Sequence, residues 1–258
     1  MAAEAPILVE TRDRKMFITF NRPEVLNAQN DSFRLGLVDA LDRFEADDGL
    51  GVALLRGNGR AFSVGADLKE PRPRSDWDHA GTMHFDRLDR CRKPLIACMH
   101  GYGLGGGLEV ALCCDIRVAT KDALLGTPEA RTIGGMPGVA VHRLGRMIPL
   151  GEALKVMLTA EPISGRRAYD IGLVQEIAPD RESMLEAGEI LADQILACNP
   201  SAMLSIKQVV RTPVELEMSL TERLASLGRI DPLVRPAGNP GAYLAERKTA
   251  RQSRQEQP

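Results

Sequence analysis

The chain has 258 residues, 44% of them hydrophobic, which is enough for one large domain or for a main domain with a smaller appendage. Its 33 Lys and Arg residues nearly balance 35 Asp and Glu residues, so no strong global field attracts nucleic acid or anionic lipid. The five cysteines are odd in number and lack the spacing of a zinc or thioredoxin-like site, which favours a reduced cytoplasmic protein.

The N-terminal residues MAAEAPILVE lack the basic and apolar regions of a secretion signal and the pattern of an organelle presequence. No apolar run approaches the ~20 residues that cross a bilayer. We therefore expect a soluble, cytoplasmic protein with neither membrane nor nucleic acid as a partner.

The first third of the chain predicts a hairpin, a helix and a buried strand. The segment ILVETRDRKMFITF predicts two strands, because β-branched and aromatic residues flank a short charged turn. Apolar residues then recur at helical spacing from Phe33 to Phe44, and Asn30 or Asp31 can cap that helix. The segment GVALLRG predicts a buried strand, which leads into the loop NGRAFSVGADLKE.

Residues 71–90 are polar at first and then weakly helical, the least core-like part of the first half. After them, PLIACMHG predicts a strand, GGLEVALCCD a helix and IRVAT a second strand, a unit that favours a right-handed crossover. Further on, GEALKVMLTA, ISGRRAYDIG and residues 181–198 predict helices, with a strand in IGLVQEIAP. Residues 200–227 also predict helix, and the Pro- and Gly-rich tail is expected to be poorly ordered at its end.

Four glycines fall within five positions between the predicted strand and helix, namely Gly103, Gly105, Gly106 and Gly107. Such density indicates close backbone approach and leaves amide N–H groups bare at a helix N-terminus, where an anion or a developing oxyanion is favoured. A purely structural turn with tight helix packing is the simpler alternative, although capping alone needs fewer glycines.

A second functional interpretation is a dinucleotide site. Gly101, Gly103 and Gly106 match the pattern GxGxxG, and Asp122 lies near the position of a ribose-binding acid. That pattern usually opens a Rossmann domain, however, and here about a hundred residues precede it.

Two glutamates occupy predicted helix starts. Glu109 lies in the first turn of the helix that the glycines open, and Glu129 follows Thr127, a possible cap, and Pro128, which suits the first helical position. A lone glutamate there usually only complements the helix dipole. Glu109, however, has apolar neighbours, so burial is expected to raise its pKa toward the range useful for proton transfer near neutral pH.

The chain resembles the enoyl-CoA hydratase (crotonase) family through the stretches RPEVLNA, AFSVGADLKE, KPLIACMHGYGLGGGLEVALCCDIRVAT, the TPE turn and ISGRRAYDIGLVQEI. The resemblance implies an α/β fold, a crotonase-like spiral of ββα units. Residues 1–195 would form this core, which binds coenzyme A and carries the catalytic groups. Residues 196–258 would form a helical C-terminal region for trimerisation.

The resemblance also implies roles for particular residues. The backbone N–H groups of Val64 and Gly106 would form an oxyanion hole for the thioester carbonyl, and Glu109 and Glu129 would be the acid/base pair. The positions that line the coenzyme A pocket are matched by Ala28, Ala66, Asp67 and Leu68.

The function implied is reversible addition of water to a 2-enoyl-CoA in fatty acid metabolism, because two glutamates favour hydration over isomerisation. No metal and no cofactor are expected beyond the coenzyme A of the substrate, and the expected assembly is a homotrimer or a hexamer made of two trimers. The alternatives are a crotonase-fold isomerase, lyase or dehydratase acting on another acyl group, a nicotinamide-dependent oxidoreductase, and a silent acyl-CoA-binding protein.

The chain departs from the family pattern in two places. After the Pro-Gly turn it reads Ala140, Val141 and His142, where a hydratase commonly has a GGT-containing stretch. Near the C-terminus, Tyr243 aligns with the usual aromatic residue and Glu246 stands where a coenzyme-binding lysine is often found, so Arg247 or Lys248 would have to replace it.

The histidines lack partners at metal-type spacing, and we interpret them as structural or surface residues. They are His79, His84, His100 and His142. A weaker hypothesis places Trp77 and His79 beside the acyl group.

Overall fold

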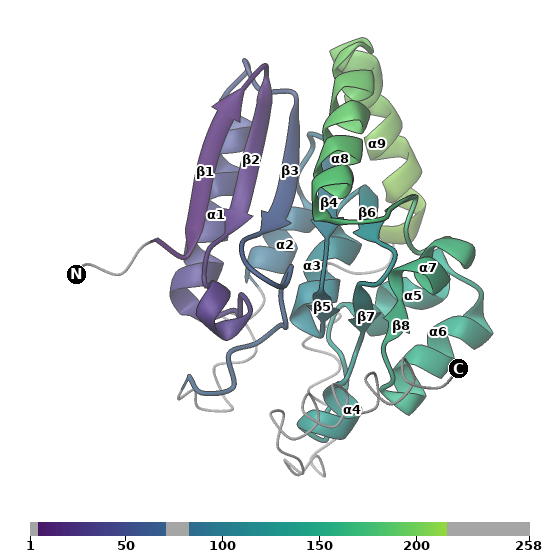
Figure 1. Cartoon of the computed structure of the whole chain (residues 1–258). Coiled ribbons are helices and arrows are strands. Elements are labelled where there is room, and N and C mark those ends of the chain that lie inside the picture. Colours follow the sequence, from purple (N-terminus) through teal and green to yellow (C-terminus); the bar gives the residue numbers. More distant parts are fainter. Residues whose placement is uncertain (1–4, 71–82, 216–258) are drawn as a thin grey trace.

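The computed structural model describes residues 5–70 and 83–215, which fold into two sheets surrounded by helices (Figure 1). The strands are β1 (Ile7–Arg12), β2 (Lys15–Phe20), β3 (Val52–Gly57), β4 (Leu95–Met99), β5 (Tyr102–Leu104), β6 (Ile116–Thr120), β7 (Leu124–Gly126), β8 (Ile163–Ser164) and β9 (Glu176–Ala178). The helices are α1 (Asp31–Ala46), α2 (Met83–Asp89), α3 (Gly106–Cys113), α4 (Glu129–Thr132), α5 (Ala140–Met147), α6 (Leu150–Thr159), α7 (Gly165–Asp170), α8 (Arg181–Leu196) and α9 (Pro200–Glu215), with a short 3-10 helix η1 (Pro23–Val25) before α1.

The larger sheet has six strands in the order β1-β2-β3-β4-β6-β9, and all neighbours are parallel except β1 and β2. Helix α1 lies between β2 and β3 in the chain, and α3 lies between β4 and β6. The predicted strand, helix and strand around the glycine-rich turn are therefore confirmed. Helices cover both faces of this sheet, which explains why β4 is buried along its whole length.

The predicted N-terminal hairpin is confirmed, with Arg12 of β1 opposite Lys15 of β2. Only Asp13 and Arg14 connect the two strands, and their φ angles are 50° and 63°. Two consecutive residues with positive φ match the twist of the flanking strands, as in the commonest two-residue hairpin turns.

Two clusters of buried side chains hold the larger sheet between helices. On one face, α1 packs with Phe33, Leu37, Leu41 and Phe44 turned inward, and it begins at the predicted cap, where the Asn30 side chain accepts a hydrogen bond from the Phe33 N–H. On the other face, α8 crosses β3, β4 and β6 and buries Met184 and Ala192 (Figure 1). Burial of these apolar surfaces is the main stabilising contribution to the fold.

The smaller sheet, with strand order β5-β7-β8, did not follow from the sequence. The predicted strand PLIACMHG ends as β4 at Met99, and three residues later the chain begins β5, which pairs with β7. Strand β8 takes the first residues of a predicted helix, which instead starts at Gly165, where the Ser164 side chain caps α7. This sheet lies below the carboxyl ends of β4 and β6 (Figure 1) and carries the candidate site.

Helix α9 contacts the residue that precedes β6 and the last residue of α2. Lys207 forms an ion pair of 2.7 Å with Asp115, and Arg211 contacts both Asp115 and Asp89. The helix predicted from residue 200 is thus confirmed as far as residue 215. Its continuation to residue 227, the poorly ordered tail and the domain boundary at residue 195 stay predictions. In the described ranges, no helix combines the length and apolar character that a membrane crossing needs.

Candidate active site

The site begins where residues 62–64 run beside β5. The Ser63 N–H donates to the Tyr102 carbonyl at 3.0 Å, and the Leu104 N–H donates to the Ser63 carbonyl at 3.0 Å. Glycine permits this approach, because a Cβ at Gly107 would lie 2.2 Å from the Ser63 oxygen, and one at Gly101 would lie 1.9 Å from the Arg60 oxygen. The predicted close backbone approach is confirmed. Gly101 and Gly107 thus serve packing between two loops, which argues against a dinucleotide turn.

The two predicted oxyanion donors are neighbours, with Val64 on the loop of Ser63 and Gly106 at the start of α3. A Cβ at Gly65, whose φ is 86°, would lie 2.7 Å from the Gly106 nitrogen, so the residue after Val64 touches the amide of Gly106. No backbone hydrogen bond from the Gly106 N–H is found among the described residues. The Val64 N–H donates to the Leu26 carbonyl at 3.2 Å, the long end of the normal range.

The positions predicted to line the coenzyme A pocket also come together. Segments 28–29 and 65–67 form a parallel bridge, in which the Gln29 N–H donates to the Gly65 carbonyl at 2.8 Å and the Asp67 N–H donates to the Gln29 carbonyl at 3.2 Å. Ala28 is buried, Ala66 is partly buried and Leu68 is 46% exposed.

An arginine that the sequence did not single out ties these segments together. Arg22 donates to the Ala28 carbonyl at 2.5 Å and forms an ion pair of 2.9 Å with Asp67. Charge-assisted bonds of this kind are stronger than neutral ones, so Arg22 fixes the distance between the two halves of the predicted pocket.

Glu109 lies in the first turn of α3 and is 5% exposed. Burial raises its pKa to about 6, as the apolar neighbours predicted. The amides of Gly138, Val139 and Ala140 at the start of α5 oppose this rise, because they stabilise the ionised form. The Ala140 N–H donates to Glu109 Oε1 at 3.0 Å, which gives the unusual MPGVA stretch a role next to the carboxylate.

Glu129 begins α4 and lies against the glycine turn. A Cβ at Gly105 would be 2.7 Å from Glu129 Oε1, and Glu129 Oε2 is buried without a partner in the described part of the chain. Burial, followed by the charge of Glu109, raises the pKa of Glu129 to about 8. The predicted cap is wrong, because Pro128 takes the cap position and the buried Thr127 hydroxyl has no hydrogen-bond partner in the described part of the chain.

The two carboxyl groups therefore share one site. Burial raises the pKa of both, and the charge of Glu109 raises that of Glu129 further. Titratable groups that are close and whose pKa values are pushed apart are typical of an acid and a base acting together.

Three buried polar residues lie beneath the glycine turn, Gln29, Ser63 and His84, and sequence reasoning missed the first two. They are 2%, 0% and 1% exposed, and they are hydrogen-bonded to one another. A glutamine directly after the apolar end of RPEVLNA was the available signal, since a buried amide needs partners. His84, interpreted from the sequence as a structural or surface residue, is buried and is linked to the site through Gln29.

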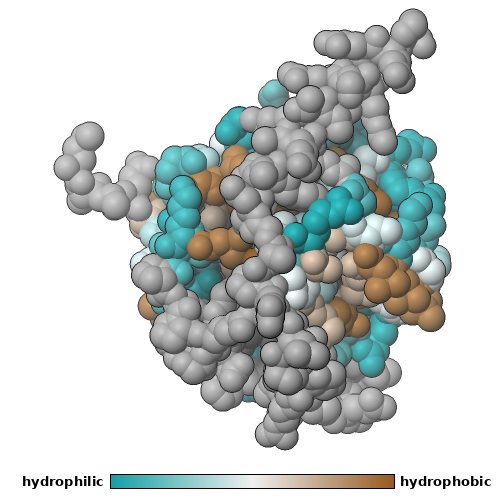
Figure 2. Space-filling model, turned by 90° about the horizontal axis from the view of Figure 1, so that it is seen from below, coloured by the Kyte–Doolittle hydropathy of each residue, from teal (hydrophilic) through white to brown (hydrophobic). Residues whose placement is uncertain are grey.

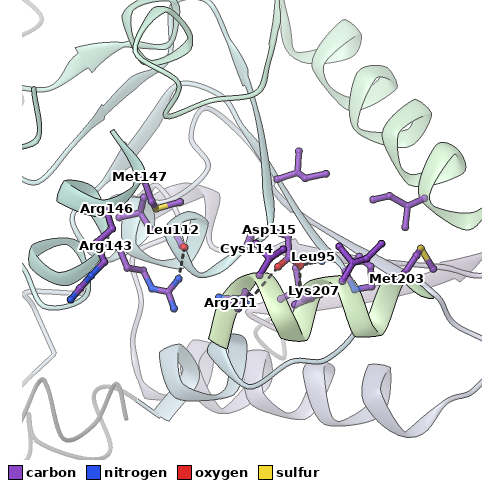
Figure 3. Close-up of a pocket in the computed structure, with 15 residues that line it drawn as sticks. Leu95, Leu112, Cys114, Asp115, Arg143, Arg146, Met147, Met203, Lys207 and Arg211 are labelled. Atoms are coloured by element: carbon purple, nitrogen blue, oxygen red, sulfur yellow. Dashed lines mark hydrogen bonds and ion pairs between the residues drawn. The ribbon is translucent and has the colours of Figure 1, made fainter. Parts of the chain in front are cut away.

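The structure also has a cavity of about 420 Å³ that is separate from these residues (Figure 3). It lies under α9, and Figure 3 shows Arg211 and Lys207 directed toward Asp115 at its wall. None of the predicted catalytic, oxyanion or coenzyme A positions lines it. Its lining is Pro94, Leu95, Leu112, Cys114, Asp115, Ile116, Arg143, Arg146, Met147, Ile195, Met203, Ile206, Lys207, Val210 and Arg211.

Several predicted positions lie outside the described residues. They are Trp77, His79, Tyr243, Glu246, Arg247 and Lys248. Within residues 5–70 and 83–215, no three His, Cys, Asp or Glu side chains gather as possible metal ligands. The candidate site thus consists of two carboxyl groups, two loop amides and the paired segments that carry them.

Comparison with known proteins gives consistent matches over most of the chain. The family model described as enoyl-CoA hydratase/isomerase matches residues 12–227. The 2,3-dehydroadipyl-CoA hydratase of Escherichia coli K12 is 35% identical over 219 residues, 82% of this chain and 84% of that protein. A probable enoyl-CoA hydratase of Rhizobium meliloti is 38% identical over 226 residues, 84% of this chain and 85% of that protein.

Solved structures agree with the sequence matches. The crystal structure of an enoyl-CoA hydratase from Mycobacterium marinum is similar to this chain with a TM-score of 0.74 and 35% identity. The likeness covers 88% of this chain and 89% of that one.

Proposed function

This chain belongs to the enoyl-CoA hydratase/isomerase family, and we propose that it adds water reversibly to the double bond of a 2-enoyl-CoA thioester. The predicted crotonase-like fold is that of the solved relatives. The observation that carries the proposal is the pair of buried carboxyl groups, Glu109 and Glu129, with pKa values of about 6 and about 8 beside the glycine turn.

The pKa values assign a direction to each proton transfer. Glu109, ionised at neutral pH, takes a proton from water as its oxygen bonds to Cβ. Glu129, protonated at neutral pH, donates a proton to Cα. One water is thus added across the double bond, and a proton passing from Glu109 to Glu129, directly or through solvent, restores the starting state.

The thioester carbonyl gains negative charge in the enolate-like transition state. The N–H groups of Gly106 and Val64 are proposed to accept that charge, which for such donors is worth several kcal/mol. The Gly106 N–H is available, and the Val64 N–H would share or exchange its 3.2 Å bond to the Leu26 carbonyl. The bridged segments around Ala28 and Ala66 are proposed to hold coenzyme A, with Asp67 and Leu68 beside them.

We propose further that no metal and no cofactor beyond the coenzyme A of the substrate takes part. Proton transfer and oxyanion stabilisation need only the groups named above. A cytoplasmic location and a role in fatty acid metabolism stay part of the proposal, and they are compatible with five cysteines that form no disulfide.

Assembly as a homotrimer, or as two trimers, is also proposed. Large apolar side chains are exposed on α6 and α9, and a surface of that kind on a globular protein indicates an interface. Figure 2 shows hydrophobic surface on the side of the molecule where α6 lies. The residues concerned are Leu150, Leu154, Leu158, Ile206, Val209 and Val210.

The function is tested by following the enoyl-thioester absorbance after crotonyl-CoA is added. The wild type should lose this absorbance, and Glu109→Gln and Glu129→Gln should each lower kcat by about 10²- to 10⁴-fold, because each removes one proton transfer. Glu182→Gln is the matched control, since Glu182 also lies in the first turn of a helix but is exposed.

Unchanged activity in both site variants would contradict the mechanism. Turnover of a 3-enoyl-CoA without hydration would favour an isomerase, and coenzyme A affinity without turnover of any enoyl chain would favour a silent binding protein. A change in NADH fluorescence on mixing with the protein would favour a nicotinamide-dependent oxidoreductase.

A further inference from the structure

We infer that Ser63, Gln29 and His84 form a buried positioning chain that sets the distance between the two amides of the oxyanion hole, a role that rests on the hydratase function proposed above. None of the three has a place in the proton transfers. Ser63 and Gln29 contact the backbone that carries Val64 and Gly106, and His84 contacts the Gln29 side chain.

The hydrogen bonds of Ser63 fix the local direction of the chain. Its hydroxyl donates to the Asn27 carbonyl at 2.8 Å and accepts from the Gly65 N–H at 3.2 Å and from Gln29 Nε2 at 3.3 Å. One donor and two acceptor positions are all that a serine hydroxyl offers, so Ser63 is fully used. Because its side chain bonds the amide two residues later, it restrains the peptide groups on both sides of Val64.

The same network defines the proton on His84. Gln29 Nε2 donates to the Ser63 hydroxyl, so Gln29 Oε1 is the atom that lies 3.2 Å from His84 Nε2. An amide oxygen can only accept, and therefore His84 Nε2 carries a hydrogen in this arrangement. The bond links α2 to the loop of Gln29, and Figure 1 places α2 between α1 and α3.

Gln29 also touches the second loop of the oxyanion hole. A Cβ at Gly106 would lie 2.9 Å from Gln29 Oε1, so the carboxamide packs against the first residue of α3. The carboxamide is thus held between Ser63 on one side and Gly106 on the other. Loss of any member leaves buried polar atoms unsatisfied, and the loops can recover their partners only by moving.

A shift of the loops should lower catalysis more than binding. Oxyanion donors must meet the charge of the transition state at about 2.7 to 3.1 Å, whereas the coenzyme A segments keep their own bridge through the Gln29 backbone. A displaced donor therefore lowers kcat and leaves KM nearly unchanged.

The experiment measures kcat and KM for crotonyl-CoA hydration in three variants. Ser63→Ala and His84→Leu should each lower kcat about tenfold to hundredfold with KM within about threefold of the wild type. His84→Gln should recover most of the loss, because a glutamine can place an N–H where His84 Nε2 lies. The comparison of the two His84 variants holds even if Ser63→Ala does not fold.

Thr19→Val is the control for simple loss of a buried hydroxyl. Thr19 lies in β2, is 6% exposed and accepts from Arg56 Nε at 2.9 Å, a bond outside the network of Ser63, Gln29 and His84. This variant should lower thermal stability and leave kcat unchanged.

A second readout needs no turnover. A cinnamoyl-CoA with a para-dimethylamino group absorbs at longer wavelength when its thioester carbonyl is polarised, so the shift on binding reports the oxyanion donors directly. The shift should be smaller in Ser63→Ala and His84→Leu than in the wild type, and His84→Gln should restore it.

Wild-type kcat and a wild-type spectral shift in Ser63→Ala and His84→Leu would overturn the positioning role and leave these residues as structural. A wild type that shifts the probe but hydrates no enoyl-CoA would instead contradict the proposed function alone. If the wild type does not shift the probe, the oxyanion hole and the positioning chain are both wrong.

Discussion

Glu109 and Glu129 share one site, but their surroundings differ. Glu109 is the more deeply buried, yet three amides at the start of α5 stabilise its ionised form. Glu129 is stabilised in its ionised form by its own backbone N–H alone, and it experiences the charge of Glu109. Burial raises both pKa values, and the amides of α5 together with the charge of Glu109 make Glu109 the proposed base.

The pH dependence of kcat/KM should therefore be bell-shaped, with an acid limb near pH 6 and an alkaline limb near pH 8. Below about pH 6 Glu109 becomes protonated and cannot accept the proton of water. Above about pH 8 Glu129 loses the proton it must donate. Because the two carboxyl groups interact, the two apparent pKa values of this profile belong to the pair and not to either residue alone.

Initial rates at low crotonyl-CoA concentration, from about pH 5 to about pH 9.5, measure this profile. Enzyme returned to pH 7 after each incubation should recover full activity, which separates titration from unfolding. A rate that stays level across the whole range would contradict the assigned roles.

At the scale of elements, the site depends on how closely α3 approaches the loop of Ser63, and the sheet beneath it depends on α1. Four large side chains of α1 are fully buried against the sheet, namely Phe33, Leu37, Leu41 and Phe44. The opposite side of α1 faces solvent, where Leu35 is 56% exposed. The two faces should thus respond differently to the same substitution.

Leu41→Ala should lower the free energy of unfolding by about 2 to 5 kcal/mol, because it removes buried contacts and leaves a cavity. Leu35→Ala, the same change on the exposed face, should alter it by less than about 0.5 kcal/mol. Urea unfolding followed by circular dichroism measures both. Equal losses would mean that α1 does not pack on the sheet as described.

At the scale of the molecule, the most exposed large apolar side chains of the described residues lie on α6 and α9. Leu150, Leu154 and Leu158 are four residues apart, so they form one stripe along α6. Val209 and Val210 are 69% and 67% exposed on α9. These two helices are therefore the surfaces on which copies of the chain are expected to meet.

Analytical ultracentrifugation should give a mass of three or six chains of 28.1 kDa for the wild type. Leu158→Glu and Val209→Glu should each give smaller species, because a charge in an apolar interface is poorly solvated. Leu35→Glu, on the distant α1, is the control and should leave the assembly intact. A monomeric wild type would contradict the proposed assembly.

Patterns that are local in the chain were enough to predict much of this structure. The hairpin, α1 with its Asn30 cap, the glycine turn and the burial of Glu109 each depend on neighbours within a few residues. The motifs that indicate the family are also contiguous stretches. The predicted element boundaries were wrong where strand pairing competed with helix formation. Strand β8, for example, consists of residues that the sequence predicted to be helical.

Only the tertiary structure decided which distant groups meet. The donors to Glu109 come from residue 140, and Gln29 meets Ser63 and His84, which are 34 and 55 residues further along the chain. Periodicity and spacing describe one segment at a time, whereas these contacts depend on how loops at the carboxyl ends of different strands converge. The sequence by itself thus determined the kind of chemistry, and the packing of those loops decided which carboxyl group the amides of α5 stabilise and which side chains lie beneath the glycine turn.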